Sequence, residues 1–227
     1  MTDLIDTTEM YLKAILELEE EGITPMRARI AERLDHSGPT VSQTVARMER
    51  DGLLRVEEDR KLLFTDEGRL TAVEVMRKHR LAELLLVEVI GLDWERVHDE
   101  ACRWEHVMSE AVERRLIELL NNPTHSPFGM PIPGLELLGL PAPEVKSCRP
   151  LSELAGGDYE LCRIGEPLQL DTSFLTQLRQ LGLVPKASTI LTIQSGEKLL
   201  TASGYQEGLL IDDSIGQHLF LCEQMAN

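Results

Sequence analysis

The segment His98-Asp99-Glu100-Ala101-Cys102-Arg103-Trp104-Glu105-His106 decides how the rest of this 227-residue chain is read. It lacks Gly, Pro and β-branched residues, so it predicts a helix. With about 3.6 residues per turn, roughly a quarter of the helix surface carries four possible metal donors, which are His98, Cys102, Glu105 and His106. Thiolate and imidazole donors favour Zn, Fe, Co, Ni or Cu over Mg or Ca. The spacing therefore predicts a transition-metal site.

A second group of donors precedes this segment. His79 and Glu83 are four residues apart, so they share one face of a predicted helix. His98 can meet them if the two helices fold back on each other. Each residue alone is explained more simply as a satisfied polar side chain, and only the combination favours a metal-binding protein.

The charge of the chain is unevenly distributed. A net charge of -16 and a pI near 4.8 argue against nucleic-acid binding, because affinity for DNA depends on basic contacts to phosphate. Residues 24–50, however, hold five Arg against three acidic residues and are locally positive. DNA binding is therefore expected from this segment and not from the surface as a whole.

The cysteine pattern and the apolar runs indicate in which cellular compartment the protein is expected. The four Cys are widely spaced without a CxxC pair, and neither a signal-peptide pattern nor a run of membrane-spanning length occurs. We therefore expect a soluble, cytoplasmic protein with no membrane partner. A reducing location also keeps Cys102 available as a thiolate.

The first 65 residues predict a DNA-binding unit. Residues 3–21 predict an amphipathic helix, on which Met10 is typical of a core side chain. Residues 26–34 and 41–50 predict two short helices joined by Ser37-Gly38-Pro39-Thr40, which is the form of a helix-turn-helix.

A predicted hairpin follows this pair of helices. Residues 53–57 and 61–65 predict two strands with Arg60 at their tip, like the wing of a winged helix. The polar residues that begin the second helix suit base edges, and Gln43 can pair with adenine. A winged helix-turn-helix that binds double-stranded DNA is therefore expected.

Two more regions follow the wing. Residues 66–90 and 93–120 predict helices, the second broken near Ser109, and their apolar residues predict a dimer interface that includes Leu81, Leu84, Leu85, Trp104 and Val107. Residues 121–150 hold seven of the eleven prolines and predict a linker with stiff polyproline-like pieces.

The last region predicts a small barrel. Five short strands are expected, at residues 159–164, 189–194, 198–202, 207–211 and 218–222, and only residues 175–181 look helical.

The expected fold is mostly α with a small β domain. We assign a winged helix DNA-binding domain to residues 1–65, a helical dimerisation and metal-binding domain to residues 66–140, the end of the proline-rich linker to residues 141–150, and an SH3-like barrel to residues 151–227.

Four motifs carry a family resemblance. Asp6-Thr7-Thr8-Glu9-Met10-Tyr11-Leu12, residues 37–45, Met76-Arg77-Lys78-His79-Arg80-Leu81-Ala82-Glu83 and residues 97–108 resemble the iron-dependent repressors of the diphtheria toxin repressor family. The match is nearly continuous over residues 1–140 and looser over the barrel. It implies a homodimeric repressor that binds operator DNA, as one or two dimers per operator, when loaded with Fe²⁺ at two sites per chain. It also implies control of iron uptake genes.

The resemblance implies roles for individual residues. The primary metal site matches Met10, Cys102, Glu105 and His106, so Met10 becomes a ligand, and the ancillary site matches His79, Glu83, His98 and Asp171. An anion site matches Arg80 and Ser126. The positions that match DNA contacts are Arg27, Ala28, Ser37, Pro39, Thr40, Ser42, Gln43, Arg47, Arg50 and Arg60.

Two positions depart from the family pattern near the ancillary site. Phe174 stands where the family has a Gln ligand, and Met130 stands where an Asn near the anion is expected. The barrel should therefore reach the ancillary metal through Asp171 alone. A small SH3-like barrel can also recognise proline-rich segments, so docking on Pro131 and Pro133 is an alternative.

Two other function classes compete with this interpretation. An enzyme could use Cys102 and His106 as nucleophile and base, but no oxyanion hole or Gly-rich loop lies near them in the sequence, so we expect no enzyme. A manganese-responsive regulator of the same fold is the stronger alternative. The Met10 and Cys102 sulfurs favour Fe²⁺ over Mn²⁺, and Co²⁺, Ni²⁺, Mn²⁺ or Zn²⁺ are expected to substitute in vitro.

Overall fold

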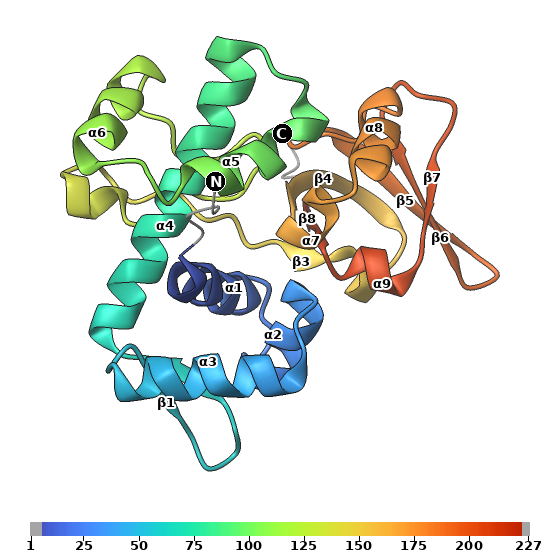
Figure 1. The fold of residues 1–227 in the computed structure, drawn as a ribbon. Helices are drawn as coiled ribbons and strands as arrows, with labels where there is room; N and C mark the ends of the chain where they lie inside the picture. The colour runs from blue at the N-terminus through green and yellow to red at the C-terminus, as the bar shows by residue number, and fades with distance from the viewer. Residues whose placement is uncertain (1–5, 224–227) are drawn as a thin grey trace.

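The DNA-binding region is built from three helices and a two-stranded hairpin in the computed structural model, which describes residues 6–223. Figure 1 shows these elements at the lower end of the molecule, with the hairpin projecting from it. Their bounds are α1 (Thr7–Glu20), α2 (Arg27–Leu34), α3 (Gly38–Arg50), β1 (Leu54–Val56) and β2 (Leu62–Phe64). The predicted winged helix-turn-helix is confirmed.

Local capping explains where two of these helices begin. Asp6 accepts a hydrogen bond from the Thr8 backbone N–H at 2.8 Å at the start of α1. Ser37 accepts from Thr40 N at the start of α3, with Pro39 in the first turn, where its missing N–H is harmless. The predicted start at residue 41 was therefore late, because the turn residues already belong to the helix.

The helical region that follows is organised around one long helix. α4 (Asp66–Leu84) continues into a π-helical segment (Leu85–Ile90), and a 3₁₀ turn (Trp94–Arg96) leads into α5 (Val97–Trp104). α6 (Glu110–Leu119) begins after Ser109, whose side chain caps it, so the predicted break near this residue is confirmed. α1 and α5 both pack against α4.

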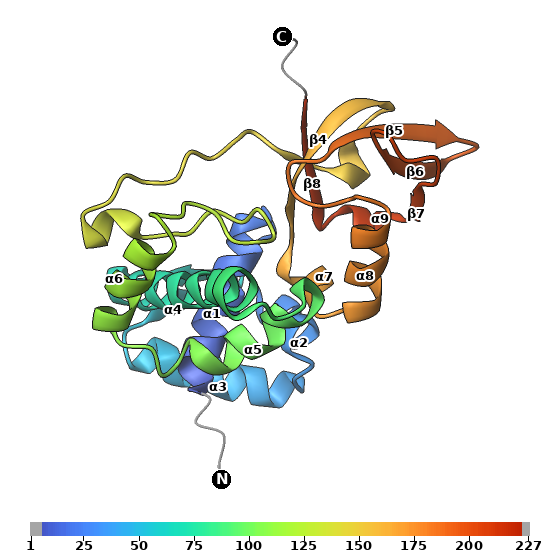
Figure 2. The same cartoon turned by 90° about the horizontal axis from the view of Figure 1, so that it is seen from above.

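The proline-rich stretch differs from its prediction as a linker. Phe128, Met130 and Ile132 are fully buried, and a 3₁₀ turn (Leu135–Leu138) closes the packed part. Residues 123–138 therefore form a folded segment, here called the strap. Large apolar side chains between its prolines are buried in the apolar cores of the protein. The remaining residues, 139–148, form the long connection seen along one edge in Figure 2.

The C-terminal region is an antiparallel sheet with the strand order β3-β8-β4-β5-β6-β7. The strands are β3 (Arg149–Pro150), β4 (Gly157–Ile164), β5 (Ser188–Gln194), β6 (Glu197–Ala202), β7 (Leu209–Ile211) and β8 (Leu219–Glu223). This antiparallel sheet is consistent with the expected SH3-like barrel, and β3 is a strand that was not expected. The expectation of a single helix was wrong, because α7 (Glu166–Gln169) and α9 (Asp213–Gly216) accompany α8 (Thr172–Gln180), as does a 3₁₀ turn (Leu151–Glu153).

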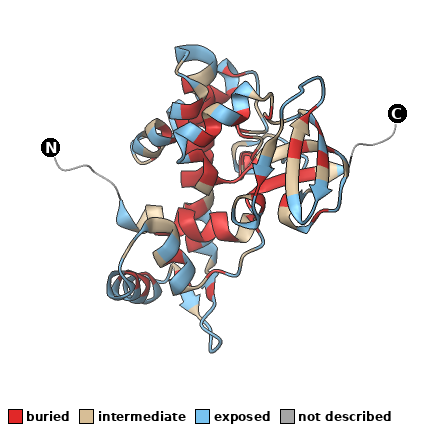
Figure 3. Ribbon diagram, turned by 90° about the vertical axis from the view of Figure 1, so that its right-hand side faces the viewer, coloured by how far each residue is buried: buried red, intermediate tan, exposed pale blue. Residues whose placement is uncertain are grey.

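Three apolar cores hold these parts together. One lies inside the DNA-binding region and includes α1, and a second joins α4, α6 and the strap. The third is shared between the barrel and the helices, because Val97 and Ala101 of α5 pack with barrel residues such as Leu161 and Leu175. In Figure 3 buried residues accordingly run through α4 into the sheet, while the tip of the wing is exposed. None of the helices in residues 6–223 has the length and apolarity to cross a membrane.

The predicted dimer interface is only partly available. Leu81 and Leu84 are buried within this chain's own second core, so they cannot also face a partner. Val107 is 74% exposed, and Val89, Ile90, Val112 and Leu119 are further exposed apolar side chains in the same region. A helical dimer would have to use this second set.

Gly129 fastens the strap to the barrel and gives a first prediction. Its φ is +78°, and a Cβ there would lie 2.0 Å from the Cys162 carbonyl oxygen, beside the hydrogen bond from Ile164 N to Phe128 O (2.9 Å). We expect Gly129→Ala to lower the free energy of unfolding by about 2–5 kcal/mol, combining a left-handed backbone penalty with a backbone clash.

Gly139→Ala is the matched control for this prediction. Gly139 has φ +84°, but apart from its chain neighbours no residue has an atom within 4 Å of the position that a Cβ would take, so only the backbone penalty of about 1–2 kcal/mol applies. Denaturant unfolding of the metal-free chain measures both. Equal losses in the two variants would mean that the contact with Cys162 does not hold the strap.

Candidate metal centre

The predicted primary ligands converge on one cavity. α5 ends at Trp104, so Glu105 and His106 lie at and beyond its last turn, unlike the single continuous helix expected from the sequence. Even so, Met10 from α1 and Cys102, Glu105 and His106 from the α5 region line a common cavity of about 180 Å³. Tertiary packing of α1 against α5's end therefore brings a thioether, a thiol, a carboxylate and an imidazole together.

The predicted ancillary ligands on the helices also meet. His79 Nε2 lies 2.9 Å from Glu83 Oε1, as their shared face on α4 requires, and 3.2 Å from His98 Nδ1. His98 Nδ1 is 3.3 Å from the same Glu83 oxygen. All three side chains are buried, so their polar atoms interact with one another in place of water.

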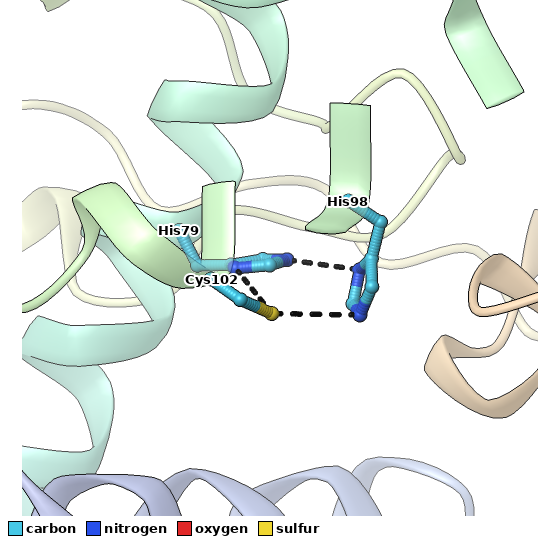
Figure 4. A group of neighbouring side chains, drawn as sticks. All are labelled: His79, His98 and Cys102. Atoms are coloured by element: carbon cyan, nitrogen blue, oxygen red, sulfur yellow. Dashed lines mark hydrogen bonds between the residues drawn. The ribbon is translucent and has the colours of Figure 1, made fainter. Parts of the chain in front are cut away.

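The two predicted ligand sets form one continuous cluster. His79 Nδ1 lies 2.6 Å from Glu105 Oε2, and Cys102 Sγ lies 3.7 Å from His98 Nε2 and 4.0 Å from His79 Nδ1. One donor atom from each of His79, His98 and Cys102 falls within 4.8 Å of the others. Figure 4 shows the two rings and the sulfur facing one another between α4 and α5.

Lys13 is a member of this cluster that the sequence analysis missed. Its Nζ donates to Glu105 Oε2 at 2.8 Å and lies 3.0 Å from His79 Nδ1 and 3.5 Å from Cys102 Sγ. The side chain is buried, so an ammonium ion stands among the donors. The available signal was its spacing, because Lys13 follows Met10 by three residues and shares its helix face.

The cluster holds anionic donors, together with imidazole protons that a bound cation would have to displace, because the pKa of His79 and that of His98 are raised. Burial would raise the pKa of Cys102 and Glu105, but Lys13 and His79 outweigh it, placing the pKa of Cys102 well below its usual value and that of Glu105 at about 2. Burial would lower the pKa of His98, but Cys102 raises it to about 9. Thiolate and carboxylate are therefore present, and the soft donor set fits a divalent transition metal.

His106 is held by a carboxylate outside the predicted ligand set. Its Nδ1 lies 2.6 Å from Glu9 Oε2 on α1, and its Nε2 lies 3.4 Å from Glu105 Oε1. The hydrogen bond with Glu9 raises the pKa of His106. A carboxylate behind a ligating imidazole fixes the orientation of the ring, which is the usual support for a metal-binding His.

At the predicted anion site, carboxylates of the chain itself already pair with Arg80. Arg80 is fully buried, and its guanidinium donates to Glu20 at 3.0 and 2.5 Å, to Glu166 Oε1 at 2.7 Å and to the Pro131 carbonyl at 2.5 Å. Ser126 Oγ accepts from Phe128 N at 3.2 Å. Arg80 Nε is buried without a hydrogen-bond partner, but the other guanidinium nitrogens are already paired, so this assignment stays a prediction.

Asp171 has a local structural role. It is exposed and caps α8, with Oδ1 accepting from Ser173 N at 3.0 Å and from Phe174 N at 2.9 Å. Phe174 enters the shared core. The acidic barrel residue that reaches the helices through a hydrogen bond to Arg80 is Glu166, which was not predicted. Asp171 as an ancillary ligand stays a prediction.

Nearly all of the predicted DNA contacts are exposed side chains. All of them except the partly buried Arg27 are exposed, and they are Ala28, Ser37, Pro39, Thr40, Ser42, Gln43, Arg47, Arg50 and Arg60. Val56 N donates to Glu49 Oε1 at 2.9 Å, which ties the wing to α3. This contact fixes the position of the wing relative to α3, the expected recognition helix, as groove binding by a winged helix requires.

Comparisons with known proteins agree over nearly the whole chain. Residues 3–62 match the family described as iron dependent repressor, N-terminal DNA binding domain, and residues 65–134 match iron dependent repressor, metal binding and dimerisation domain. The iron-dependent repressor IdeR of Mycobacterium tuberculosis is 57% identical over 91% of this chain and 93% of the relative.

Two further proteins extend the comparison. The diphtheria toxin repressor of Corynebacterium diphtheriae is 52% identical over 94% of this chain and 96% of its own. The solved structure of the manganese regulator SloR superposes with a TM-score of 0.77 at 27% identity, covering 96% of this chain and 98% of that one.

Proposed function

This chain belongs to the iron-dependent repressor family, and from that premise we propose that it represses transcription by binding operator DNA as a homodimer when loaded with Fe²⁺. The observation that carries the proposal is the cavity where Met10, Cys102, Glu105 and His106 meet, since one of its walls is the helix that also builds the DNA-binding core. Its relatives are named as repressors and not as enzymes, and we propose no catalytic role.

The proposed primary ligands are Met10, Cys102, Glu105 and His106, and the proposed ancillary ligands are His79, Glu83, His98 and Asp171. A divalent cation would supply the positive charge that neutralises Cys102 and Glu105 and crosslinks α1 to α5. The ancillary set shares contacts with the primary one through His79 and Glu105, which supports coupling between the two sites.

α1 is the element through which ligand binding reaches DNA. Its residues Tyr11, Leu12 and Ile15 pack in one core with Val41 and Val45 of α3. A shift of α1 therefore changes the placement of α3, because closely packed cores transmit displacement. Two recognition helices in a dimer must enter major grooves about 34 Å apart or a multiple of that distance, so their placement decides operator binding.

The DNA-binding face supports recognition by both charge and base contacts. Arg47, Arg50 and Arg60 are exposed where they can reach phosphate, and Ser42 and Gln43 lie on the recognition helix for base edges. Phosphate contacts make the affinity steeply dependent on salt despite the acidic remainder of the chain. Whether one or two dimers occupy an operator follows from its half-site spacing.

The proposal is tested with chelated protein and a duplex selected from random sequences in the presence of Fe²⁺. Under anaerobic conditions, operator binding should require Fe²⁺, with Mn²⁺ effective only at higher concentration. Binding that is unchanged by chelation contradicts the proposal. A lower activating concentration for Mn²⁺ than for Fe²⁺ supports the manganese-responsive alternative, which the likeness to the manganese regulator SloR motivates.

Cys102→Asp tests what sets the metal preference. Replacing the thiolate by a carboxylate makes the donor set harder, so the activating concentrations of Fe²⁺ and Mn²⁺ should approach each other by about tenfold or more. The ratio of the two midpoints in an operator-binding titration is the measurement. An unchanged ratio would mean that the sulfur does not determine selectivity.

Asp171→Ala tests the barrel's contribution to the ancillary site. We expect weaker binding of the second metal equivalent and a more mobile barrel, with activation through the primary site largely retained. Loss of the α8 cap should also lower stability by about 0.5–2 kcal/mol. Asp212→Ala is the matched control, since Asp212 caps α9 in the same way. If both variants bind two metals as tightly as the parent chain, Asp171 is a cap and not a ligand.

A further inference from the structure

Three of the four cysteines gather at one edge of the barrel, away from Cys102. Cys222 lies on β8, Cys162 on the neighbouring strand β4, and Cys148 immediately precedes β3 on the other side of β8. The register pairs Arg149 with Leu221, so Cys148 falls opposite Cys222. The irregularity in β4 lies between Leu161 and Arg163, which is the position of Cys162.

The three sulfurs are mutually close and chemically free. The three Sγ atoms all lie within 4.8 Å of one another, and Cys162 Sγ is 2.7 Å from Cys222 Sγ. All three are free thiols and partly buried. Three thiols from three chain segments thus share one small volume.

The cluster opens onto a cavity that offers room for a fourth ligand. Cys148 and Cys162 line a cavity of about 430 Å³ together with His125 and Glu160. Lys146 and Arg163 also line it and supply positive charge near the thiols.

We propose that Cys148, Cys162 and Cys222 form a separate binding site for a thiophilic cation of the Zn²⁺ class, with the fourth position open to solvent in this cavity. Tetrahedral zinc with Zn–S bonds of about 2.3 Å places sulfurs about 3.8 Å apart, which the cluster reaches with small side-chain shifts. Each thiol releases its proton to solvent on binding. The site uses none of the residues of the iron centre, so it stands independently of the proposed function.

The bound cation would fix the long connection to the barrel. Residues 139–148 contain no helix or strand, and Cys148 lies at their end. A crosslink from Cys148 to β4 and β8 anchors this connection to the sheet beside the strap residue Gly129, which contacts Cys162. The cysteine site would thus stabilise the position of the barrel without entering the metal centre.

The test uses the full chain with Cys102→Ser, which leaves only these three thiols. The chain is reduced, freed of metal by chelation and exposed to Zn²⁺ alone, and alkylation of each thiol is followed by mass spectrometry. All three thiols should become protected together as Zn²⁺ is added to saturation. Co²⁺ in its place should produce sulfur-to-cobalt charge-transfer absorption.

Added substitutions assign the protection to the cluster. Cys148→Ser in the same background should weaken Zn²⁺ affinity by on the order of a hundredfold, whereas the neighbouring Ser147→Ala should leave it unchanged. Zn²⁺ held only by His79 and His98 leaves the thiols reactive, so alkylation at equal rates with and without Zn²⁺ overturns the proposal. A Cys162–Cys222 disulfide that forms in air equally fast with Zn²⁺ present also overturns it.

Discussion

A chain carrying Met10→Ala is expected to lose metal-dependent operator binding while it still forms a dimer. Met10 is the only proposed primary ligand on α1, and the other three lie on α5 and just beyond it. Without the thioether, metal binding no longer joins the DNA-binding core to the dimerisation helices. Coupling between two sites commonly spans about 5–150-fold, so we expect operator affinity with Fe²⁺ present to fall on the order of a hundredfold.

Fluorescence anisotropy with a labelled operator, with and without Fe²⁺, measures this loss, and sedimentation measures the dimer. Met108→Ala is the matched control, because Met108 is also a partly buried methionine but does not line the metal cavity. It should keep its metal dependence. If operator affinity is the same with and without metal in both Met10→Ala and the parent chain, metal binding does not control DNA binding through Met10.

Lys13→Met is expected to have opposite effects on the metal-free and metal-loaded protein. The Lys13 ammonium is bound to Glu105 and lies close to Cys102, so it balances the charge that a divalent cation would balance. Removing one partner from a buried ion pair typically lowers stability by about 3–5 kcal/mol, and the metal-free chain should lose stability on this order. Metal binding should tighten, because no ammonium has to leave the donors.

The charge-preserving variant Lys13→Arg separates charge from packing. It should keep most of the metal-free stability, whereas Lys13→Met should approach the parent chain only when metal is bound. Denaturant unfolding in chelator and in saturating Co²⁺ gives the two stabilities, and competition with a chelating dye gives the affinity. If Lys13→Met binds Co²⁺ no more tightly than the parent chain, Lys13 does not compete with metal.

Lys13 also gives a physical account of the unloaded state. Burial opposes its charge, but the attraction of Cys102 and Glu105 outweighs burial and raises the pKa of Lys13 above its usual value. The side chain therefore stays charged and holds α1 near α5 without metal. A divalent cation bound among the same donors would have to take the place of this ammonium, so metal binding would change the contact that holds α1 near α5.

Sequence patterns were sufficient for most of the local elements. Ser109 starts a helix because its hydroxyl accepts a backbone N–H group one turn later, and such a signal is contained in a few residues. Ser37 carries the same signal, which the predicted start at residue 41 overlooked. The pairing of His79 with Glu83 likewise follows from helical spacing alone. The five strands expected in the barrel are also present, as β4 to β8.

Tertiary structure decided which of these elements share side chains. Arg80 and Glu166 are 86 positions apart, and nothing local to either residue indicates that they form a buried pair. Lys13 enters the metal centre, Phe128 enters a core and three cysteines meet, because packing brings distant segments together. Sequence patterns report the geometry of a few neighbouring residues, so they determined most of the helices and the wing and predicted the types of ligand. The charge balance of the centre depends on contacts that only the folded chain creates.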